Sequence, residues 1–257
     1  MKNILALFDG ISCGQAALNK AGVDFDTYYS SEIDAKCVEV TTANYPNTVH
    51  LGDVTNWQSW DIEDIDLIMG GSPCQGFSFA GKQLNFNDPR SKLFFTMVDI
   101  INHFKPKYFL LENVVMKQSY QDIISQKLGV QPVFINSSDI TPQSRRRLYW
   151  TNIPGFTSGP KPKITKLSEI LHVKKGFTKI DPVTAVCMTA RQFANWKGTY
   201  ITTPKGLRKL TPVECERLQN LPDDYTSAVA DGHRYRSLGN GWTVDVITHI
   251  FSLIPKV

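Results

Sequence analysis

Short apolar runs of strand length alternate with helical patterns through the first 150 residues. Consecutive parallel strands need a crossover connection, which is usually a helix, so this alternation favours a mostly parallel sheet with helices on both faces. Strands are expected at Ile4–Phe8, Thr27–Ser31, Asp66–Met69, Tyr108–Leu111, Val133–Ile135 and Arg147–Thr151. Helices are expected at Gln15–Ala21 and Lys92–Phe104, with a loop at Asp9–Gly14 between the first strand and helix. We therefore predict an α/β fold.

The composition changes after Trp150. The stretch that follows is rich in proline, glycine, lysine and threonine and has no sustained period, so we interpret it as a small irregular insert. The predicted organisation is a first domain at residues 1–155, the insert at 156–205, and a segment at 206–257 that returns to the first domain.

Helical signals return in the C-terminal segment. Thr211 is expected to cap a helix that runs to Leu218, with Pro212 at its first position and Glu214 completing a capping box. A second, apolar helix is expected at Val244–Leu253.

Charge and cysteine content narrow the class of protein. The net charge of +4 permits a polyanionic partner without requiring one. The five cysteines are odd in number and lack ligand spacing, so we predict neither a disulfide framework nor a metal site. The N-terminal apolar run is too short for a membrane span and lacks a signal-peptide cleavage pattern. These features predict a cytoplasmic protein with reduced thiols and no membrane partner.

A glycine-bearing loop between the first strand and helix is typical of a nucleotide site. Its elements are Phe8, Gly10 and Gly14, followed by the acidic Glu32 at the end of the next strand, where a carboxylate can accept hydrogen bonds from ribose hydroxyls. The loop alone does not distinguish a nicotinamide cofactor from S-adenosylmethionine, and a plain structural turn is an alternative. Asp53, after the following segment, is either an adenine contact or a loop cap.

Cys74 lies just after a buried strand, in the segment Gly70-Gly71-Ser72-Pro73-Cys74-Gln75-Gly76. Open α/β sheets bind their ligands at the carboxyl ends of strands, and the glycines and Pro73 impose an unusual backbone path there. A thiol in this position can act as a covalent nucleophile once it is deprotonated. We therefore prefer a catalytic role for Cys74 over that of a buried structural cysteine.

Several motifs occur in the order seen in DNA cytosine-C5 methyltransferases, and the chain resembles that family over nearly its whole length except the insert. The motifs are Phe8-Asp9-Gly10, Glu32, Gly52-Asp53-Val54, Pro73-Cys74-Gln75, Glu112-Asn113-Val114, Gln143-Ser144-Arg145-Arg146-Arg147, Arg208-Lys209-Leu210-Thr211-Pro212-Val213-Glu214-Cys215 and Gly239-Asn240-Gly241. The resemblance implies a Rossmann-like S-adenosylmethionine-dependent sheet, with residues 1–155 catalytic and 156–205 a small target-recognition insert.

The resemblance also implies roles for individual residues. Cys74 would attack carbon 6 of cytosine, and Glu112 would hydrogen-bond ring nitrogen 3 and the exocyclic amine. Arg145 and Arg147 would bind the cytosine carbonyl and steady the site; alternation along a strand puts both on one face and Arg146 on the other. The expected contacts to S-adenosylmethionine, and to its product S-adenosylhomocysteine, are Phe8, Asp9, Gly10, Ser12, Gly14, Glu32, Ile33, Asp53, Val54, Pro73, Asn113, Asn240, Gly241 and Trp242.

The implied partner is double-stranded DNA, whose target base must be flipped out of the duplex to reach a buried thiol. Expected substrate contacts are Ser78, Lys82, Asn113 and Arg191, and the lysines of the insert suit phosphate contact. We expect a monomer in a prokaryotic or phage-infected cell, and the family allows a cognate restriction nuclease as a partner.

Three alternatives stand beside this reading. A tRNA cytosine-C5 methyltransferase would share the fold and cofactor, but that branch usually carries a Cys-Phe-Thr motif, which is absent. A non-catalytic DNA-binding relative would be expected to lack Cys74 or Glu112. A nicotinamide oxidoreductase would share the glycine loop without explaining the Pro-Cys segment.

Overall fold

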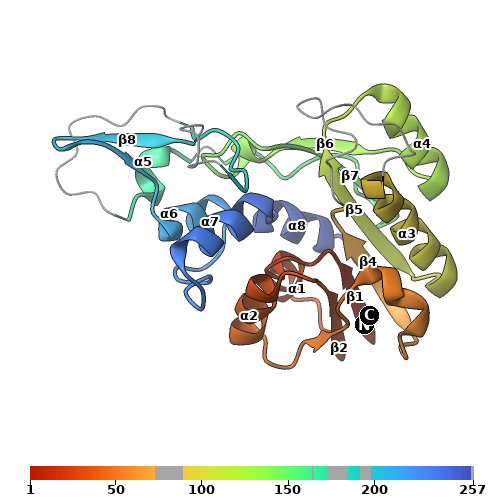
Figure 1. The fold of residues 1–257 in the computed structure, drawn as a ribbon. Helices are drawn as coiled ribbons and strands as arrows, with labels where there is room; N and C mark the ends of the chain where they lie inside the picture. Colours follow the sequence, from red (N-terminus) through yellow and green to blue (C-terminus); the bar gives the residue numbers. More distant parts are fainter. Residues whose placement is uncertain (73–88, 164, 173–183, 192–197, 256–257) are drawn as a thin grey trace.

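A seven-stranded sheet forms the centre of the computed structural model, which describes residues 1–72, 89–163, 165–172, 184–191 and 198–255 (Figure 1). The strand order is β3-β2-β1-β4-β5-β7-β6. The strands are β1 (Asn3–Leu7), β2 (Thr27–Ser31), β3 (Val49–His50), β4 (Ile65–Gly70), β5 (Tyr108–Val114), β6 (Val133–Asn136) and β7 (Arg146–Thr151). The strands β1 to β5 are parallel to one another, whereas β7 is antiparallel to both β5 and β6. The predicted α/β sheet is confirmed.

Helices cover both faces of this sheet, as predicted. The described helices are α1 (Cys13–Ala21), α2 (Ala35–Asn44), η1 (Val54–Ser59), α3 (Pro89–Phe104), α4 (Gln118–Leu128), η3 (Ser137–Asp139), α5 (Leu167–Ile170), α6 (Pro212–Leu218), α7 (Asp231–Asn240) and α8 (Val244–Phe251). Alternate residues of one strand enter two separate cores, because successive side chains of a strand point to opposite faces. Ile4 of β1 packs with α1 and α8, and Leu5 packs with α3 and α4.

Three boundaries differ from the prediction. The strand that we ended at Leu111 continues to Val114, because antiparallel β7 offers backbone partners to residues 110–114. The first helix begins at Cys13, inside the predicted loop. The preceding residue, Ser12, has a left-handed backbone (φ 55°) and is the N-cap of the helix. The predicted apolar C-terminal helix ends at Phe251 rather than Leu253.

The C-terminal helix signals are confirmed. Thr211 Oγ1 accepts a hydrogen bond from the Glu214 backbone N–H, and the Glu214 carboxylate accepts one from the Thr211 N–H. Pro212 occupies the first turn, where a missing N–H costs nothing.

The insert is more regular than we predicted. A hairpin of β8 (Tyr200–Thr203) and β9 (Gly206–Lys209) extends away from the large sheet (Figure 1), and its turn contains the predicted boundary between residues 205 and 206. Irregular structure was therefore wrong for Tyr200–Thr203, where antiparallel pairing with β9 supplies the order that the composition did not suggest.

No helix among the described residues is long and apolar enough to cross a membrane.

Candidate active site

The parallel strands bring the predicted cofactor residues to one edge of the sheet. Phe8 follows β1, Glu32 follows β2 and Asp53 follows β3. Gly71, which was not among the predicted residues, follows β4 at the same edge. Since the carboxyl ends of parallel strands meet at the same edge, these residues line a common rim, where α/β proteins bind nucleotides.

The loop after β1 has an unusual backbone. Phe8 (φ 55°), Gly10 (φ 59°) and Ser12 (φ 55°) all adopt the left-handed region within five residues. For a non-glycine residue this conformation costs about 1–3 kcal/mol and persists only when the surroundings enforce it. Such strain at a strand end is typical of a ligand-binding loop.

Asp9 points away from the rim and supports the loop. Its carboxylate accepts hydrogen bonds from the hydroxyls of Tyr28 (2.8 Å), Ser30 (2.8 Å) and Ser12 (2.5 Å). Burial raises the pKa of this carboxyl, and the hydroxyl donors partly oppose that rise. Its side chain is therefore occupied by the protein itself.

Glu32 also serves the loop. Its Oε2 accepts the Gly10 backbone N–H at 2.8 Å, and its Oε1 accepts those of Ile33 and Asp34, each at 2.8 Å. A carboxylate has about four acceptor positions, so capacity remains for a further donor. The adjacent Ile33 is 75% exposed, which leaves an apolar surface beside that carboxylate.

Asp53 is exposed and caps η1. Its Oδ1 accepts the backbone N–H (2.8 Å) and the hydroxyl (2.9 Å) of Thr55, which realises the loop-cap alternative, while the neighbouring Val54 is buried.

Trp242 of the C-terminal segment lies close to Gly14 of α1 and to Gly71, which follows β4. A β-carbon placed on Gly71 would lie 3.0 Å from Glu112 Oε2 and 3.1 Å from Trp242 Nε1. One placed on Gly14 would lie 2.6 Å from Met69 Sδ and 3.5 Å from Trp242 Cζ3. Both glycines therefore allow close approach, and residues far apart in the sequence converge on the rim. Asn240, at the end of α7, is exposed.

Glu112 and Arg147 form an ion pair within the sheet. Arg147 Nε lies 2.8 Å from Glu112 Oε1, and both side chains are largely buried. The N–H is not directed at Oε1, which has no hydrogen-bond donor among the described residues. Burial alone would lower the pKa of Arg147, but the charge of Glu112 raises it above its usual range. The pair thus keeps a buried carboxylate oxygen able to accept another donor.

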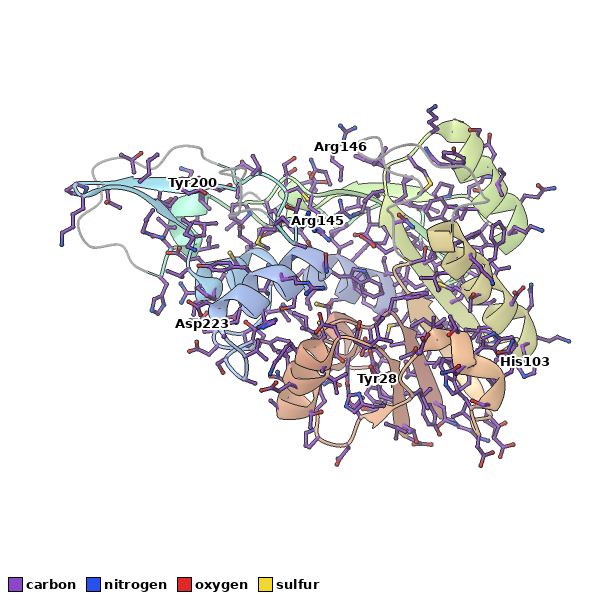
Figure 2. All side chains as sticks on the ribbon, in the orientation of Figure 1. Tyr28, His103, Arg145, Arg146, Tyr200 and Asp223 are labelled. Atoms are coloured by element: carbon purple, nitrogen blue, oxygen red, sulfur yellow. The ribbon has the colours of Figure 1, made fainter. Side chains whose placement is uncertain are left out.

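Arg145 is buried, and its hydrogen bonds connect segments that are distant in the sequence. Its guanidinium donates to the carbonyls of Met188 (3.2 Å), Gly239 (3.4 Å) and Gly241 (2.8 Å). Burial, followed by the charge of Arg147, lowers its pKa. Figure 2 shows Arg145 turned toward the C-terminal helices and Arg146 turned away from them, in agreement with the predicted alternation, although β7 begins only at Arg146.

Asn113 holds the backbone that leads into the Pro-Cys segment. Its Nδ2 lies 3.2 Å from Ser72 Oγ and 3.4 Å from the Ser72 carbonyl, and its Oδ1 accepts the Val114 N–H at 2.8 Å. Ser72 is the last described residue before that segment. Pro73, Cys74, Ser78 and Lys82 were predicted site residues that lie outside the described residues.

Cys187 is a site neighbour that sequence reasoning did not single out. Its Sγ lies 3.6 Å from Arg145 Nη1 and 3.9 Å from Arg147 Nη2. No spacing signal in the sequence connects residue 187 with the arginines. The other described cysteines, Cys13, Cys37 and Cys215, are buried, and burial raises the pKa of each, that of Cys13 to about 12.

Two buried glutamines were also missed as structural residues. Gln143 donates to the Leu218 carbonyl (3.2 Å) and accepts the Met188 N–H (2.9 Å). Gln219 donates to the carbonyls of Leu238 (2.8 Å) and Gly241 (3.1 Å). The Gln143 motif position could have indicated such a role, but nothing marks Gln219. Arg191, predicted to contact substrate, is exposed at the end of a described stretch.

The fold is one that known methyltransferases share. The C-5 cytosine-specific DNA methylase family matches residues 2–180 and 157–256, and the chain belongs to that family. It is 31% identical to the type II methyltransferase M.NlaX of Neisseria lactamica, over 97% of this chain and 95% of that protein.

Other relatives are longer or more distant. The type II methyltransferase M.NgoBV of Neisseria gonorrhoeae is 34% identical over 60% of this chain, but the match spans only 42% of that protein. Among solved structures, the Entamoeba histolytica methyltransferase EhMeth has a TM-score of 0.80 at 18% identity, covering 98% of this chain and 97% of that one. Spodoptera frugiperda DNMT2 (an E260A/E261A/K263A mutant) has a TM-score of 0.74 at 22% identity, covering 98% and 99%. These structures support the fold.

Proposed function

We propose that this protein transfers a methyl group from S-adenosylmethionine to carbon 5 of cytosine in double-stranded DNA, through a covalent adduct between Cys74 and a flipped base. The observation that supports this most strongly is the buried Glu112 oxygen, which faces Arg147 and has no hydrogen-bond donor among the described residues. The exocyclic amine of cytosine is a donor that suits this oxygen. Family membership supports both the reaction and the cofactor.

The chemistry requires a nucleophile and a group that stabilises charge in the ring. The Cys74 thiolate would form a bond to carbon 6, which breaks the ring conjugation and makes carbon 5 electron-rich. Glu112 would stabilise the charge at ring nitrogen 3 and the amine, where it develops. After carbon 5 is methylated, loss of its proton would break the bond between sulfur and carbon 6 and release the thiolate.

Two arginines would have different tasks. Arg147 would orient Glu112 and face the base. Arg145 donates to three backbone carbonyls and would act as a positioning residue. Asn113 would hold Ser72, and so the approach to Pro73 and Cys74, in place.

The rim fits S-adenosylmethionine. Glu32 has acceptor capacity left for ribose hydroxyls, and the exposed Ile33 offers an apolar surface to adenine. Phe8, Gly10, Ser12, Gly14 and Trp242 would enclose the remainder, with Asp53 and Val54, Asn240 and Gly241 at its margins; Asp9 would act from behind the loop. When bound, the cofactor supplies an electrophilic methyl group on a sulfonium.

The remaining assignments stay predictions. Residues 156–205 would recognise the target, with Arg191, Ser78 and Lys82 contacting DNA. We also propose that the protein is a cytoplasmic monomer, with a cognate restriction nuclease as a partner.

One observation keeps a second substrate class under consideration. The insert contains Cys187-Met188-Thr189, which differs at one position from the Cys-Phe-Thr motif usual in the tRNA branch, and Cys187 lies beside both arginines. A tRNA cytosine-C5 methyltransferase is therefore the alternative to test directly.

The test is transfer of labelled methyl from S-adenosylmethionine to unmethylated duplex DNA, with tRNA in parallel. Label in DNA as 5-methylcytosine, lost in Cys74→Ala and retained in Cys187→Ala, is expected; Cys74→Ser should abolish turnover while leaving cofactor binding nearly intact. Label in tRNA alone would assign the enzyme to the RNA branch. Activity that follows Cys187 instead of Cys74 would overturn the assigned nucleophile.

A further inference from the structure

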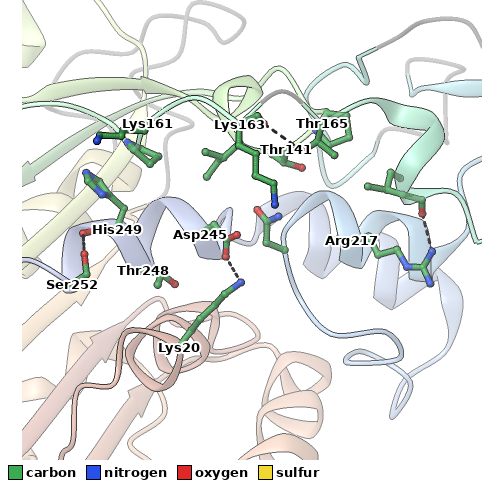
Figure 3. Close-up of a pocket in the computed structure, with 15 residues that line it drawn as sticks. Lys20, Thr141, Lys161, Lys163, Thr165, Arg217, Asp245, Thr248, His249 and Ser252 are labelled. Atoms are coloured by element: carbon green, nitrogen blue, oxygen red, sulfur yellow. Dashed lines mark hydrogen bonds and ion pairs between the residues drawn. The ribbon is translucent and has the colours of Figure 1, made fainter.

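A hollow of about 520 Å³ lies apart from the residues of the candidate active site (Figure 3). Its walls come from the C-terminal end of α1, residues 140–142, residues 160–163, Thr165, and the helices α5, α6 and α8. None of the residues proposed for the cofactor or for cytosine lines it. Sites for small molecules usually have volumes of roughly 300–1,000 Å³, so the hollow is large enough for a compact ligand.

Positive charge dominates this lining. Four cationic side chains, Lys20, Lys161, Lys163 and Arg217, face one carboxylate, Asp245. Lys20 is paired with Asp245, and Arg217 with Asp223. Lys161 and Lys163 are exposed and have no acidic partner among the described residues. Figure 3 shows Lys163 extending toward Asp245 from the side opposite Lys20, and Lys161 at the margin of the hollow near His249.

The lining also includes a hydrogen-bond acceptor without a donor. Asn220 lines the hollow, and its Oδ1 is buried and has no hydrogen-bond partner among the residues that the structure describes. A buried polar atom left unpaired destabilises a protein, so such an atom beside a cavity points to a missing donor. The lining also includes apolar side chains, Ile140, Pro142 and Ile170.

We propose that this hollow binds a phosphate monoester of nucleotide size. Its phosphate would lie against Lys163, with Lys161 adding positive charge at the margin of the hollow. A hydroxyl or amine of the same ligand would donate to Asn220 Oδ1, and the rest would cover the apolar side chains. The paired charges of Lys20 and Asp245 would form the floor without competing for the phosphate. Lysine ammonium groups bind phosphate as point charges, so the affinity should fall as salt is raised.

Isothermal titration calorimetry with adenosine 5′-monophosphate tests this site. We expect Lys161→Ala/Lys163→Ala to weaken binding about tenfold, which corresponds to the loss of two charge-assisted contacts. Asn220→Asp should weaken it as well, because it replaces a neutral acceptor with a negative charge. Asparagine and aspartate both tolerate the left-handed backbone of residue 220 (φ 57°), so that change adds no backbone strain. Lys127→Ala, an exposed change on α4, is the matched control and should bind like the wild type.

Two further experiments, duplex DNA binding by the double lysine variant and competition between the monophosphate and the duplex, identify the source of the phosphate. If the hollow takes a free nucleotide, the double lysine variant should bind duplex DNA like the wild type. If it takes a terminal phosphate of nucleic acid, that variant should weaken duplex binding and the monophosphate should compete with the duplex. Equal monophosphate affinity in the wild type and the double variant, or no binding by the wild type, would overturn the proposal. Methyl transfer to DNA is a separate readout, so this failure would leave the proposed reaction untouched.

Discussion

Arg147 Nε lies 2.8 Å from Glu112 Oε1 across the antiparallel pair of β7 and β5. The strand register places Arg147 opposite Val114, two residues from Glu112, so the two side chains meet diagonally on one face of the sheet. Arg147 thus supplies the counter-ion of the Glu112 carboxylate, which would otherwise be a buried charge without a partner.

Removal of that counter-ion should destabilise the protein and the site together. We expect Arg147→Met to lower the free energy of unfolding by about 3 kcal/mol, because it leaves a buried charge unpaired, and to abolish methyl transfer. Urea unfolding and the methyl-transfer assay measure the two effects. Arg146→Met, on the exposed side of the same strand, is the control and should cost no more than about 0.5 kcal/mol. Equal losses for the two variants would contradict the role given to the ion pair.

The contact between Asn113 and Ser72 should be measurable as a coupling. Asn113→Ala and Ser72→Ala each remove one side of the 3.2 Å hydrogen bond. In a double-mutant cycle we expect a coupling energy of about 1 kcal/mol in the free energy of unfolding. We also expect Asn113→Ala to lower kcat more than it raises KM for DNA, since it loosens the approach to Cys74. Strict additivity of the two substitutions would show that Asn113 does not anchor this backbone.

A methyl group at Gly71 should disturb the site with little effect on the rest of the fold. Its β-carbon would lie 3.0 Å from Glu112 Oε2 and 3.1 Å from Trp242 Nε1, so Gly71→Ala should displace one of them and reduce methyl transfer at least about tenfold. The control is Gly232→Ala in α7, where nothing lies within 4 Å of the new atom. That change should stabilise the protein by about 0.5–1 kcal/mol, because alanine favours a helix over glycine. Wild-type activity in Gly71→Ala would show that the added β-carbon fits without displacing Glu112 or Trp242 from its working position.

Asp9 should give stability a specific pH dependence. Burial raises the pKa of its carboxyl in the folded protein, so the folded state holds this proton at pH values where the unfolded chain has lost it. The contribution of Asp9 therefore falls as the pH rises from about 4 through the raised value. Asp9→Asn removes this titration. The difference in unfolding free energy, wild type minus variant, should decrease across that window; a difference that is constant or increases would contradict the direction assigned to the pKa.

The sequence predicted the parts of the fold that depend on local pattern. Short runs of strand length predicted β1, β2, β4 and β5 to within a few residues, and the Thr211 capping box predicted the start of α6. Both signals are carried by neighbouring residues, so a single chain displays them. The β8–β9 hairpin was missed because each strand is short and is ordered by pairing with the other.

The candidate site divides in the same way. The sequence by itself determined the α/β class, the order of the motifs and the residue types available for chemistry, because these are properties of the chain. Only the tertiary structure decided that Arg145 spends its donors on carbonyls of residues 188, 239 and 241, and that Cys187 stands beside Arg147. Those contacts join residues 40 to 96 positions apart in the sequence. Their geometry depends on how strands and helices pack, and no local sequence pattern records that packing.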